Sequence, residues 1–570
     1  MDRNTVEKIW IKHYPAGVPA EIDPNVYRSL PQLFDASIAK YRHRPAYMCM
    51  GSTITFDALE KMSRNVAAWL QSVGLKKGTR VAIMLPNILQ YPVCLFGILR
   101  AGLTVVNVNP LYTPRELEHQ LKDADVEAII ILENFAVKLE EVISKTSIKH
   151  VVVASMGDLL GAKGFLVNFV VRTVKKLVPA WHIPGAIKFN DMLSKGASAR
   201  FMPVDIEPDD IAFLQYTGGT TGLSKGAVLL QRNVVANLQQ VSAWFSPVHD
   251  DSKPYLMVTP LPLYHIYSLT CCCLHMLEDG GCNILIPNPR DIPAFIKEMR
   301  KHKFTSITGL NTLYNALMNS PDFNTIDFSA MRLSTAGGMA MQQSVAERWH
   351  KATGVPILEG YGLTETSPVA TSNPVNLTEY SGTIGMPLPS TIITIRDDNG
   401  NILGLGQPGE ICIAGPQVMQ GYWNQPAETA KVMTADGALK TGDIGFMDDR
   451  GFIKIVDRKK DMILISGFNV YPNEIEEVIA GCPGVQECVA IGVPDENSGE
   501  APKVFIVKKD PALTEAQVLE HCHKYLTGYK RPKHIEFRTE LPKTNVGKIL
   551  RRALRDDEIK KHPAEMQKIN

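Results

Sequence analysis

An eleven-residue stretch, residues 216–226, has the composition of a phosphate-binding loop. It reads Tyr-Thr-Gly-Gly-Thr-Thr-Gly-Leu-Ser-Lys-Gly. Its glycines let the backbone turn N–H groups toward a polyanion, its hydroxyl groups donate hydrogen bonds, and Lys225 adds a positive charge. A flexible surface turn can have a similar composition, so this stretch alone leaves both interpretations open.

The residue order in this loop differs from that of the common P-loop. In a P-loop, Gly-Lys-Ser/Thr closes the loop and opens a helix. Here Lys225 precedes Gly226, and residues 227–230 are apolar and typical of a strand. We therefore expect the loop to connect two strands.

Four other motifs carry groups that suit a nucleotide. Residues 361–366, Tyr-Gly-Leu-Thr-Glu-Thr, place an aromatic face, a hydroxyl and a carboxylate close together. Thr-Gly-Asp at 441–443, Asp-Arg-Lys-Lys-Asp at 457–461 and Pro-Lys-Thr-Asn-Val-Gly-Lys at 542–548 follow in that order. A Tyr ring can stack on adenine, and Mg²⁺ prefers one or two carboxylates together with phosphate oxygens.

In this order and at these separations, the motifs resemble those of the acyl-adenylate-forming superfamily of AMP-binding enzymes. Residues 436–460 and 456–472 look most like bacterial long-chain fatty acyl-CoA synthetases, and the resemblance covers nearly the whole chain. It implies an enzyme that uses ATP, Mg²⁺ and CoA to convert a fatty acid into acyl-AMP and then acyl-CoA, with release of pyrophosphate and AMP.

The resemblance also implies roles for individual residues. Those assigned to ATP are Tyr216, Thr217, Gly218, Gly219, Thr220, Thr221, Gly222, Lys225, Gly337, Gly338, Gly360, Tyr361, Gly362, Thr364, Asp443, Arg458 and Lys548. Those assigned to catalysis are Lys548, Glu365, His265 and Thr364, with Glu365 as the Mg²⁺ ligand. Ser466, Gly467 and Phe468 match the loop that contacts CoA, and Lys460 matches the hinge position.

Three of these residues also have ordinary structural interpretations. Glu365 could be a solvated surface carboxylate, and His265, beside an apolar run, could be a core histidine. For Lys548 we predict a helix over 547–555 whose first turn carries cations, where the helix dipole disfavours them unless an anion binds. A solvated helix lysine is the alternative.

The chain departs from the family pattern at two places. Gly437-Ala438-Leu439-Lys440 stands where many acyl-CoA synthetases have a Trp before Thr-Gly-Asp, and Ala340 stands where Pro often follows the two glycines. The nucleotide residues are intact. The changes therefore bear on packing around the acyl site, and hence on the preferred chain length.

Composition limits the classes of protein that remain. The chain has 570 residues, 45% of them hydrophobic and 21% charged, and a formal net charge of +1. It is longer than a single core allows, and its balanced charge argues against a nucleic-acid-binding surface. The 10 Cys lack paired metal spacing, so we expect reduced core thiols in a cytoplasmic protein.

The order of expected elements predicts an α/β protein with three parts. A large N-terminal domain, 1–457, would contain α/β subdomains and, at 370–457, a small antiparallel β subdomain rich in turns. A hinge at 458–460 would precede a small, mobile α+β C-terminal domain, 461–570.

Periodicity and turn signals place individual elements. In the first third of the chain we expect helices at 63–73, 88–101 and 114–123, the last with a Thr113/Glu116 capping box, and parallel strands at 80–84, 104–107 and 128–132. In the last part we expect helices at 473–480 and 514–525, and strands at 485–492, 503–507 and 534–537.

No segment is predicted to cross a membrane. The N-terminal residues lack a secretory h-region, and the longest apolar run, 266–277, is too short. Residues 163–178, however, form a basic amphipathic pattern that suits either peripheral contact with an anionic membrane, at the cytoplasmic face of the inner membrane, or packing on the core. A homodimer is left open.

Several functions compete with the long-chain ligase. They are a medium-chain or aryl acid CoA ligase, an adenylation domain that loads a carrier protein, a luciferase and a catalytically silent nucleotide-binding module. The chain shows no carrier segment with a phosphopantetheine site after Lys548, and Lys548, Glu365 and Asp443 are all present, which disfavours the carrier-loading and silent alternatives.

Overall fold

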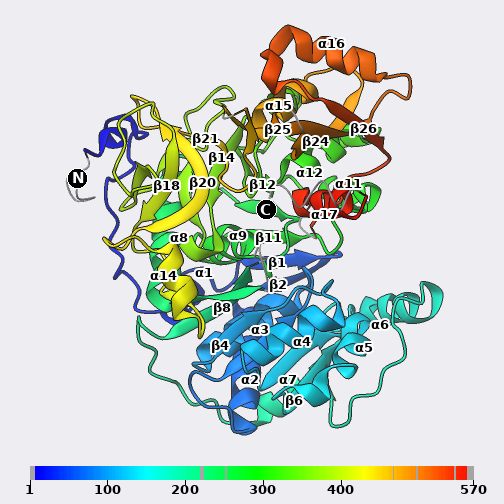
Figure 1. The fold of residues 1–570 in the computed structure, drawn as a ribbon. Coiled ribbons are helices and arrows are strands. Elements are labelled where there is room, and N and C mark those ends of the chain that lie inside the picture. Colours follow the sequence, from blue (N-terminus) through cyan, green and yellow to red (C-terminus); the bar gives the residue numbers. More distant parts are fainter. Residues whose placement is uncertain are drawn as a thin grey trace.

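The computed structural model describes residues 7–217, 224–250, 253–466, 468–495, 498–544 and 547–561. Two large sheets form most of the molecule, a small antiparallel sheet lies beside them, and a final α+β unit sits at the top in Figure 1. The predicted α/β class, with a large N-terminal part and a small C-terminal part, is confirmed.

The first large sheet has the strand order β19-β9-β8-β4-β3-β5-β6-β7. Its strands are β3 (Arg80–Met84), β4 (Thr104–Asn107), β5 (Ala128–Leu132), β6 (His150–Ala154), β7 (Ile187–Lys188), β8 (Ile211–Thr217), β9 (Lys225–Leu230) and β19 (Gly421–Tyr422). The three strands predicted here occur at the predicted residues and are parallel. Strands β9 and β19 join in antiparallel orientation and close the edge beside the loop after β8.

The second large sheet has the order β16-β15-β14-β13-β12-β10-β11-β1-β2. Its strands are β1 (Pro45–Cys49), β2 (Ser52–Thr55), β10 (Leu256–Thr259), β11 (Cys282–Leu285), β12 (Ser306–Gly309), β13 (Leu333–Ala336), β14 (Ile357–Gly362), β15 (Val369–Ser372) and β16 (Met386–Pro387). The centre of this sheet, from β1 to β14, is parallel, so the carboxyl ends of β13 and β14 meet at one edge.

Helices cover the two sheets. They are α1 (Leu30–Tyr41), α2 (Phe56–Ser72), α3 (Gln90–Arg100), α4 (Pro114–Asp123), α5 (Ala136–Glu140), α6 (Lys163–Phe169), α7 (Phe189–Ser198), α8 (Gln231–Phe245), α9 (Ile266–Ser268), α10 (His275–Glu278), α11 (Ile292–Met299), α12 (Asn311–Met318), α13 (Gln343–Thr353) and α14 (Pro426–Val432). The capping box of α4 is present, with Thr113 and Glu116 each bonding the other's backbone. Among the described residues, no helix combines the length and the apolar character needed to cross a bilayer.

The remaining two sheets are small. The antiparallel sheet consists of β17 (Ile392–Arg396), β18 (Gly409–Ala414), β20 (Leu439–Met447) and β21 (Ile453–Arg458), as the turn-rich sequence predicts. The final unit contains β22 (Ile463–Ile465), β23 (Phe468–Val470), β24 (Val485–Asp495), β25 (Gly499–Lys508), β26 (His534–Arg538), α15 (Pro472–Ala480), α16 (Glu515–Tyr525) and α17 (Arg551–Lys561). Each helix and strand predicted in this unit up to residue 537 is present.

Two predictions about helices need correction. The helix predicted over 547–555 begins only at Arg551, because residues 542–544 and 548–550 pair in antiparallel orientation, with Leu550 N donating to Pro542 O at 2.8 Å. These two paired segments are called the hairpin. The basic amphipathic pattern over 163–178 suggests one continuous helix, but the segment is α only as far as Phe169 and continues as a π-helical turn, Val170–Val174.

Candidate active site

The glycine-rich loop connects two strands, as predicted. Strands β8 and β9 pair in antiparallel register with Thr217 opposite Lys225. The glycines and threonines at its tip, Gly218, Gly219, Thr220, Thr221 and Gly222, lie outside the described residues. Lys225 forms an ion pair with Glu428 of α14, and its ammonium lies 5.2 Å from the centre of the Tyr422 ring. A cation is therefore already held at the base of the loop.

Tyr216, near the end of β8, connects the base of this loop to α4. Its hydroxyl donates to the carboxylate of Asp123, the last residue of α4, and burial together with Asp123 raises the pKa of the phenol. A Cβ on Gly226 would lie 3.1 Å from the Tyr216 ring, so glycine is needed for this contact. The side chain of Tyr216 thus ties the strand pair to α4.

Glu365 is a buried carboxylate with one oxygen uncommitted. It lies in a 3-10 turn, Thr364–Thr366, directly after β14. Tyr422 Oη donates to Glu365 Oε1 at 2.7 Å, and no described residue donates to Glu365 Oε2. Because Mg²⁺ uses one or two protein carboxylates and completes its shell with phosphate and water, this arrangement fits a magnesium ligand. Glu365 is therefore not a solvated surface carboxylate.

Three residues predicted to bind the nucleotide come from three strands and meet at Asp443. Tyr361 Oη donates to Asp443 Oδ2 at 2.6 Å, and Arg458 Nε lies 3.1 Å from Asp443 Oδ1. Tyr361 is the next-to-last residue of β14, while Asp443 and Arg458 are paired across β20 and β21. Burial of Tyr361 beside this carboxylate raises its pKa. Asp443 is thus fixed from two sides.

The predicted glycines give the backbone close contacts that a side chain would prevent. A Cβ on Gly337 would lie 3.0 Å from the ring of Tyr267 and 3.2 Å from the carbonyl oxygen of Gly360. A Cβ on Gly362 would lie 1.9 Å from Pro368 O, and Gly338 has a φ of +80°. These positions form a narrow floor at the carboxyl ends of β13 and β14.

Lys548 reaches the site from a hairpin turn and not from a helix. Lys548 N donates to Thr544 Oγ1 at 3.1 Å, and Thr544 N donates to Lys548 O at 2.6 Å. The helix-dipole argument for this residue is therefore wrong. The preceding Gly547, with a φ of +90°, lies against α12, where its carbonyl oxygen accepts from Thr312 Oγ1 at 3.4 Å.

The surroundings of Lys548 suit an anion. Burial, and next the positive charge of Arg458, lower the pKa of its ammonium to about 8, while Asp443 opposes this change. His265, at the N-terminus of α9, accepts a hydrogen bond from Tyr267 N at 3.3 Å through Nδ1. Burial, with a further contribution from Lys548, lowers the pKa of His265 to about 4, so the ring is neutral.

A cavity of about 280 Å³ adjoins this group of side chains. Its lining combines basic, acidic and hydroxyl groups with apolar side chains, and consists of Leu363, Glu365, Glu410, Tyr422, Lys431, Val432, Leu439, Lys440, Thr441, Gly442 and Lys459. A few polar and charged groups set among apolar ones are typical of a ligand pocket.

The predicted CoA loop lies in the final unit. Ser466 has a φ of +50°, and its N donates to Ser498 O at 2.7 Å. Gly467 lies outside the described residues. The side chain of Phe468 is 57% exposed and stacks on Tyr529, with ring centres 5.1 Å apart. Lys460 is exposed within the turn that follows β21.

Sequence reasoning missed several partners of the site. Tyr422, which holds Glu365, and Glu428, which holds Lys225, come from β19 and α14, far along the chain from the motifs that they support. No local pattern distinguishes them from other surface residues. Only the antiparallel pairing of β19 with β9 brings them to the loop.

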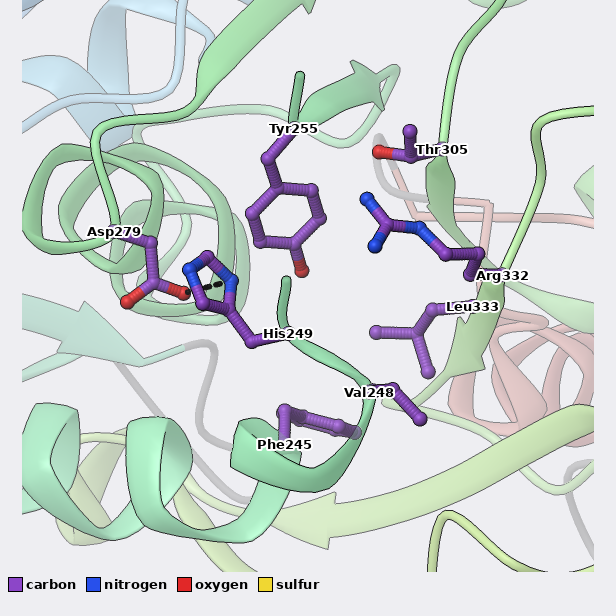
Figure 2. Close-up of a pocket in the computed structure, with 8 residues that line it drawn as sticks. All are labelled: Phe245, Val248, His249, Tyr255, Asp279, Thr305, Arg332 and Leu333. Atoms are coloured by element: carbon purple, nitrogen blue, oxygen red, sulfur yellow. Dashed lines mark ion pairs between the residues drawn. The ribbon is translucent and has the colours of Figure 1, made fainter. Parts of the chain in front are cut away.

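A second, much smaller pocket lies apart from these residues (Figure 2). Its volume is about 10 Å³, and it is lined by Phe245, Val248, His249, Tyr255, Asp279, Thr305, Arg332 and Leu333. His249 Nδ1 lies 3.5 Å from Asp279 Oδ2 inside it. The pocket has room for about one water molecule, so it does not compete as a substrate site.

Comparison with known proteins finds close relatives over the whole length. A long-chain-fatty-acid–CoA ligase of Escherichia coli O157:H7 is 57% identical over 554 residues, which are 97% of this chain and 98% of that protein. The enzyme of the same name from Haemophilus influenzae is 53% identical over 98% of this chain and 100% of that protein. The crystal structure of ATP-bound MatB from Rhodopseudomonas palustris superposes with a TM-score of 0.80 at 29% identity, covering 92% of this chain and 98% of that one.

Family models match the two parts of the chain separately. The model for AMP-binding enzymes matches residues 34–423, and the model for the C-terminal domain of AMP-binding enzymes matches residues 474–548. Tyr361, Glu365 and Lys225 lie within the first match, and Lys548 is the last residue of the second. With its motifs, its two matched segments and relatives of the same length, the chain belongs to the family of AMP-binding enzymes.

Proposed function

We propose that this protein is a long-chain fatty acid–CoA ligase that activates its substrate with ATP. A carboxylate oxygen of the fatty acid attacks the α-phosphorus of ATP, the bond to the β-phosphate oxygen breaks, and pyrophosphate leaves. The sulfur of CoA then attacks the acyl carbonyl carbon, and AMP leaves as acyl-CoA forms. The names and full-length similarity of the relatives support the long-chain substrate class.

The position of Lys548 is the observation that carries this proposal. A half-buried cation from the C-terminal hairpin lies near Arg458, Asp443 and His265, all of which come from other parts of the fold. Two anions, a carboxylate and a phosphate, repel each other on approach, and a buried cation reduces that repulsion. Lys548 therefore supports acyl-AMP formation.

The other candidates divide the remaining tasks. Asp443 and Arg458 bind the ribose, and the face of Tyr361 with the glycine floor receives the adenine. Lys225 and the loop after Thr217 bind the outer phosphates, and Thr364 donates to the α-phosphate. Glu365 would hold Mg²⁺, and the ion would supply positive charge that neutralises the phosphates and makes pyrophosphate a better leaving group. His265 orients the fatty acid carboxylate as a neutral donor.

The thioester step needs a different arrangement. Ser466, Gly467 and Phe468 lie in the same small domain as Lys548, about eighty residues earlier, and one rigid domain cannot direct both segments at the same carbonyl. We therefore assign Lys460, in the exposed turn after β21, to a hinge about which residues 461–570 rotate between the two half-reactions.

Separate assays of the half-reactions test this mechanism. Lys548→Ala should abolish acyl-AMP formation and still convert supplied acyl-AMP and CoA into thioester, whereas Gly467→Leu should do the reverse. Lys543→Ala is a matched control, since Lys543 belongs to the same hairpin but pairs with Glu487 at 2.6 Å. Equal loss of both half-reactions in Lys548→Ala and Gly467→Leu would contradict the mechanism.

The acyl preference is tested by pyrophosphate release. Short, medium, long and aryl acids are compared with CoA present, and the highest kcat/KM is expected for long chains. A maximum with medium-chain or aryl acids would replace the long-chain assignment and leave the ligase chemistry standing.

We also propose that α6 and the π-helical turn after it contact an anionic membrane. Two polar side chains of this segment bond to the rest of the protein: Asn168 Oδ1 accepts from Gly157 N at 2.7 Å, and Arg172 pairs with Glu133 at 2.9 Å. The apolar side chains face outward, with exposed fractions of 84% for Phe165, 65% for Leu166, 56% for Phe169, 64% for Val174 and 53% for Leu177. The segment projects at the right of Figure 1.

Because these apolar side chains point away from the protein, packing on the core does not explain them. Lys175 and Lys176 end the segment beside Val174 and Leu177, so basic and apolar groups are presented together, as anionic interfaces require. Because basic and apolar side chains are exposed together, an anionic bilayer fits this segment better than an apolar protein partner does.

Vesicle sedimentation tests the membrane proposal with two kinds of variant. Phe165→Ser with Phe169→Ser should reduce binding to all vesicles, and Lys175→Glu with Lys176→Glu should reduce binding to anionic vesicles only. Lys301→Glu with Lys303→Glu, on exposed positions elsewhere, is the control. Binding that is equal to neutral and anionic vesicles, and unchanged in every variant, would assign the segment a purely structural role.

A further inference from the structure

Asp457 is a buried carboxylate that none of the roles above uses. It is the next-to-last residue of β21, its side chain is 0% exposed, and it stands opposite Ile444 of β20. The neighbouring pair in the same register is Asp443 with Arg458, the proposed ribose site. A charge buried at this point needs partners, because an unpaired one would cost several kcal/mol.

The partners of Asp457 lie mostly on the other side of the proposed hinge. Oδ1 accepts from Arg458 N at 2.6 Å, but Oδ2 accepts from Asn473 N at 2.9 Å, at the start of α15. Asn473 returns a hydrogen bond through Nδ2 to the carbonyl oxygen of Val456 at 3.4 Å. Strand β21 and helix α15 are thus joined by two side chains.

Arg551 extends this connection to the Lys548 hairpin. Arg551 Nη2 lies 2.7 Å from Asn473 Oδ1 and 2.8 Å from Glu476 Oε1, and Nη1 lies 4.0 Å from Asp457 Oδ1. Arg551 begins α17, directly after the hairpin, so a guanidinium held on α15 also fixes the hairpin that carries Lys548.

These contacts cross the proposed hinge. Asp457 precedes residues 458–460, whereas Asn473, Glu476 and Arg551 follow them, so rotation about that segment separates Asp457 from its partners. We propose that Asp457 is a positioning residue that holds the C-terminal domain in the orientation that places Lys548 at the site, and so promotes acyl-AMP formation specifically. The inference rests on the proposed function and its hinge.

The Asp457→Asn variant tests this role with little change in shape. An amide NH₂ would face the backbone N–H of either Arg458 or Asn473, and the attraction to Arg551 would be lost. Acyl-AMP formation should fall about tenfold or more as the orientation equilibrium shifts. Conversion of supplied acyl-AMP and CoA should be unchanged or faster, which a general loss of structure would not produce.

Glu558→Gln is the matched control. Glu558 is also a buried carboxylate, but it pairs with Lys503 at 2.8 Å inside the C-terminal domain and bridges no hinge. It should lower the melting temperature without changing the ratio of the two half-reactions. If Asp457→Asn does not fold, Arg551→Lys replaces it, because lysine keeps the charge but cannot reach both Asn473 and Asp457. Arg551→Lys should likewise slow acyl-AMP formation and leave thioester formation from supplied acyl-AMP unchanged or faster.

The outcomes separate this inference from the proposed function. If Lys548→Ala affects acyl-AMP formation alone while Asp457→Asn or Arg551→Lys lowers both half-reactions equally, the positioning role is refuted and the ligase mechanism stands. If Lys548→Ala leaves acyl-AMP formation intact, the mechanism itself fails, and the role of Asp457 with it.

Discussion

The lowered pKa of Lys548 predicts an alkaline limit on acyl-AMP formation. Burial and the nearby Arg458 lower this pKa to about 8, so Lys548 loses the proposed charge within an accessible pH range. About nine-tenths of the free enzyme would carry the charge at pH 7 and about a tenth at pH 9. The kcat/KM for acyl-AMP formation should therefore fall about tenfold between these values. Bound ATP should move the limit of kcat to higher pH, because an anion favours the ammonium form.

The assay compares the two half-reactions across pH 6.5 to 10. Rapid quenching measures acyl-AMP formation without CoA, and thioester formation is measured from supplied acyl-AMP. The thioester step should rise with pH, since a thiol ionises near pH 8.5. In Lys548→Arg the side chain stays charged, so the alkaline limit should disappear even though the rate is lower. A limit that persists in Lys548→Arg, or that both half-reactions share, would refute the assignment to Lys548.

The same pKa has a consequence for stability. In the unfolded chain Lys548 regains the ordinary lysine pKa of 10.5, so between pH 8 and 10.5 the unfolded state binds more protons, and this residue's contribution to stability rises with pH. Below pH 8 the charged Lys548 lowers the free energy of unfolding by its full amount, which is on the order of 3 kcal/mol. Lys548→Met should therefore raise the melting temperature at pH 7 and have little effect at pH 10.5. An equal effect at both values would contradict this account.

Other substitutions address the remaining site residues. Glu365→Gln should raise the Mg²⁺ concentration needed for half-maximal rate and slow acyl-AMP formation by about 2–4 kcal/mol of barrier, seen in a Mg²⁺ titration. Tyr422→Phe removes only the hydrogen bond to Glu365, and we expect a loss of about tenfold in the same titration. Gly337→Val should raise the KM for ATP or fatty acid because its Cβ would lie 3.0 Å from the Tyr267 ring, with melting temperature as the control for folding. Asp443→Asn should raise the KM for ATP, measured by isotope exchange between pyrophosphate and ATP.

The sequence predicts elements well where local signals agree. Strands β3, β4 and β5 occur at the predicted residues because each is a short apolar run with clear boundaries, and α4 begins at Thr113 because its capping box satisfies the first backbone donors. The motif residues Tyr361, Asp443 and Arg458 could be assigned to one site only through the resemblance. Asp443 and Arg458 meet because β20 pairs with β21, and Tyr361 reaches Asp443 from a strand of another sheet.

The wrong helix at 547–555 and the two alternatives left open at 163–178 have the same physical cause. Residues 547–555 have helical composition, but Gly547 with positive φ and the bond from Thr544 to Lys548 hold the first part in a hairpin. At 163–178 the amphipathic pattern does not reveal which face meets the protein. A partner on another element, Glu133 for Arg172, decides that. Tertiary partners of this kind are invisible to periodicity.

The charge distribution of the site argues that it is built for anions. Lys548 and Arg458 lie half-buried near each other, with Asp443 as the nearby carboxylate that opposes their repulsion, and this crowding of positive charge contributes to the low pKa values of Lys548 and His265. Such an arrangement costs stability in the free protein and becomes favourable when a nucleotide phosphate and a carboxylate enter. The same argument explains why Arg551, surrounded by Glu476, Asp457 and Asp461, lies just outside it. Arg551 is paired with several protein carboxylates and therefore holds structural elements together. Lys548 has few carboxylate neighbours, so its charge remains available to the substrate.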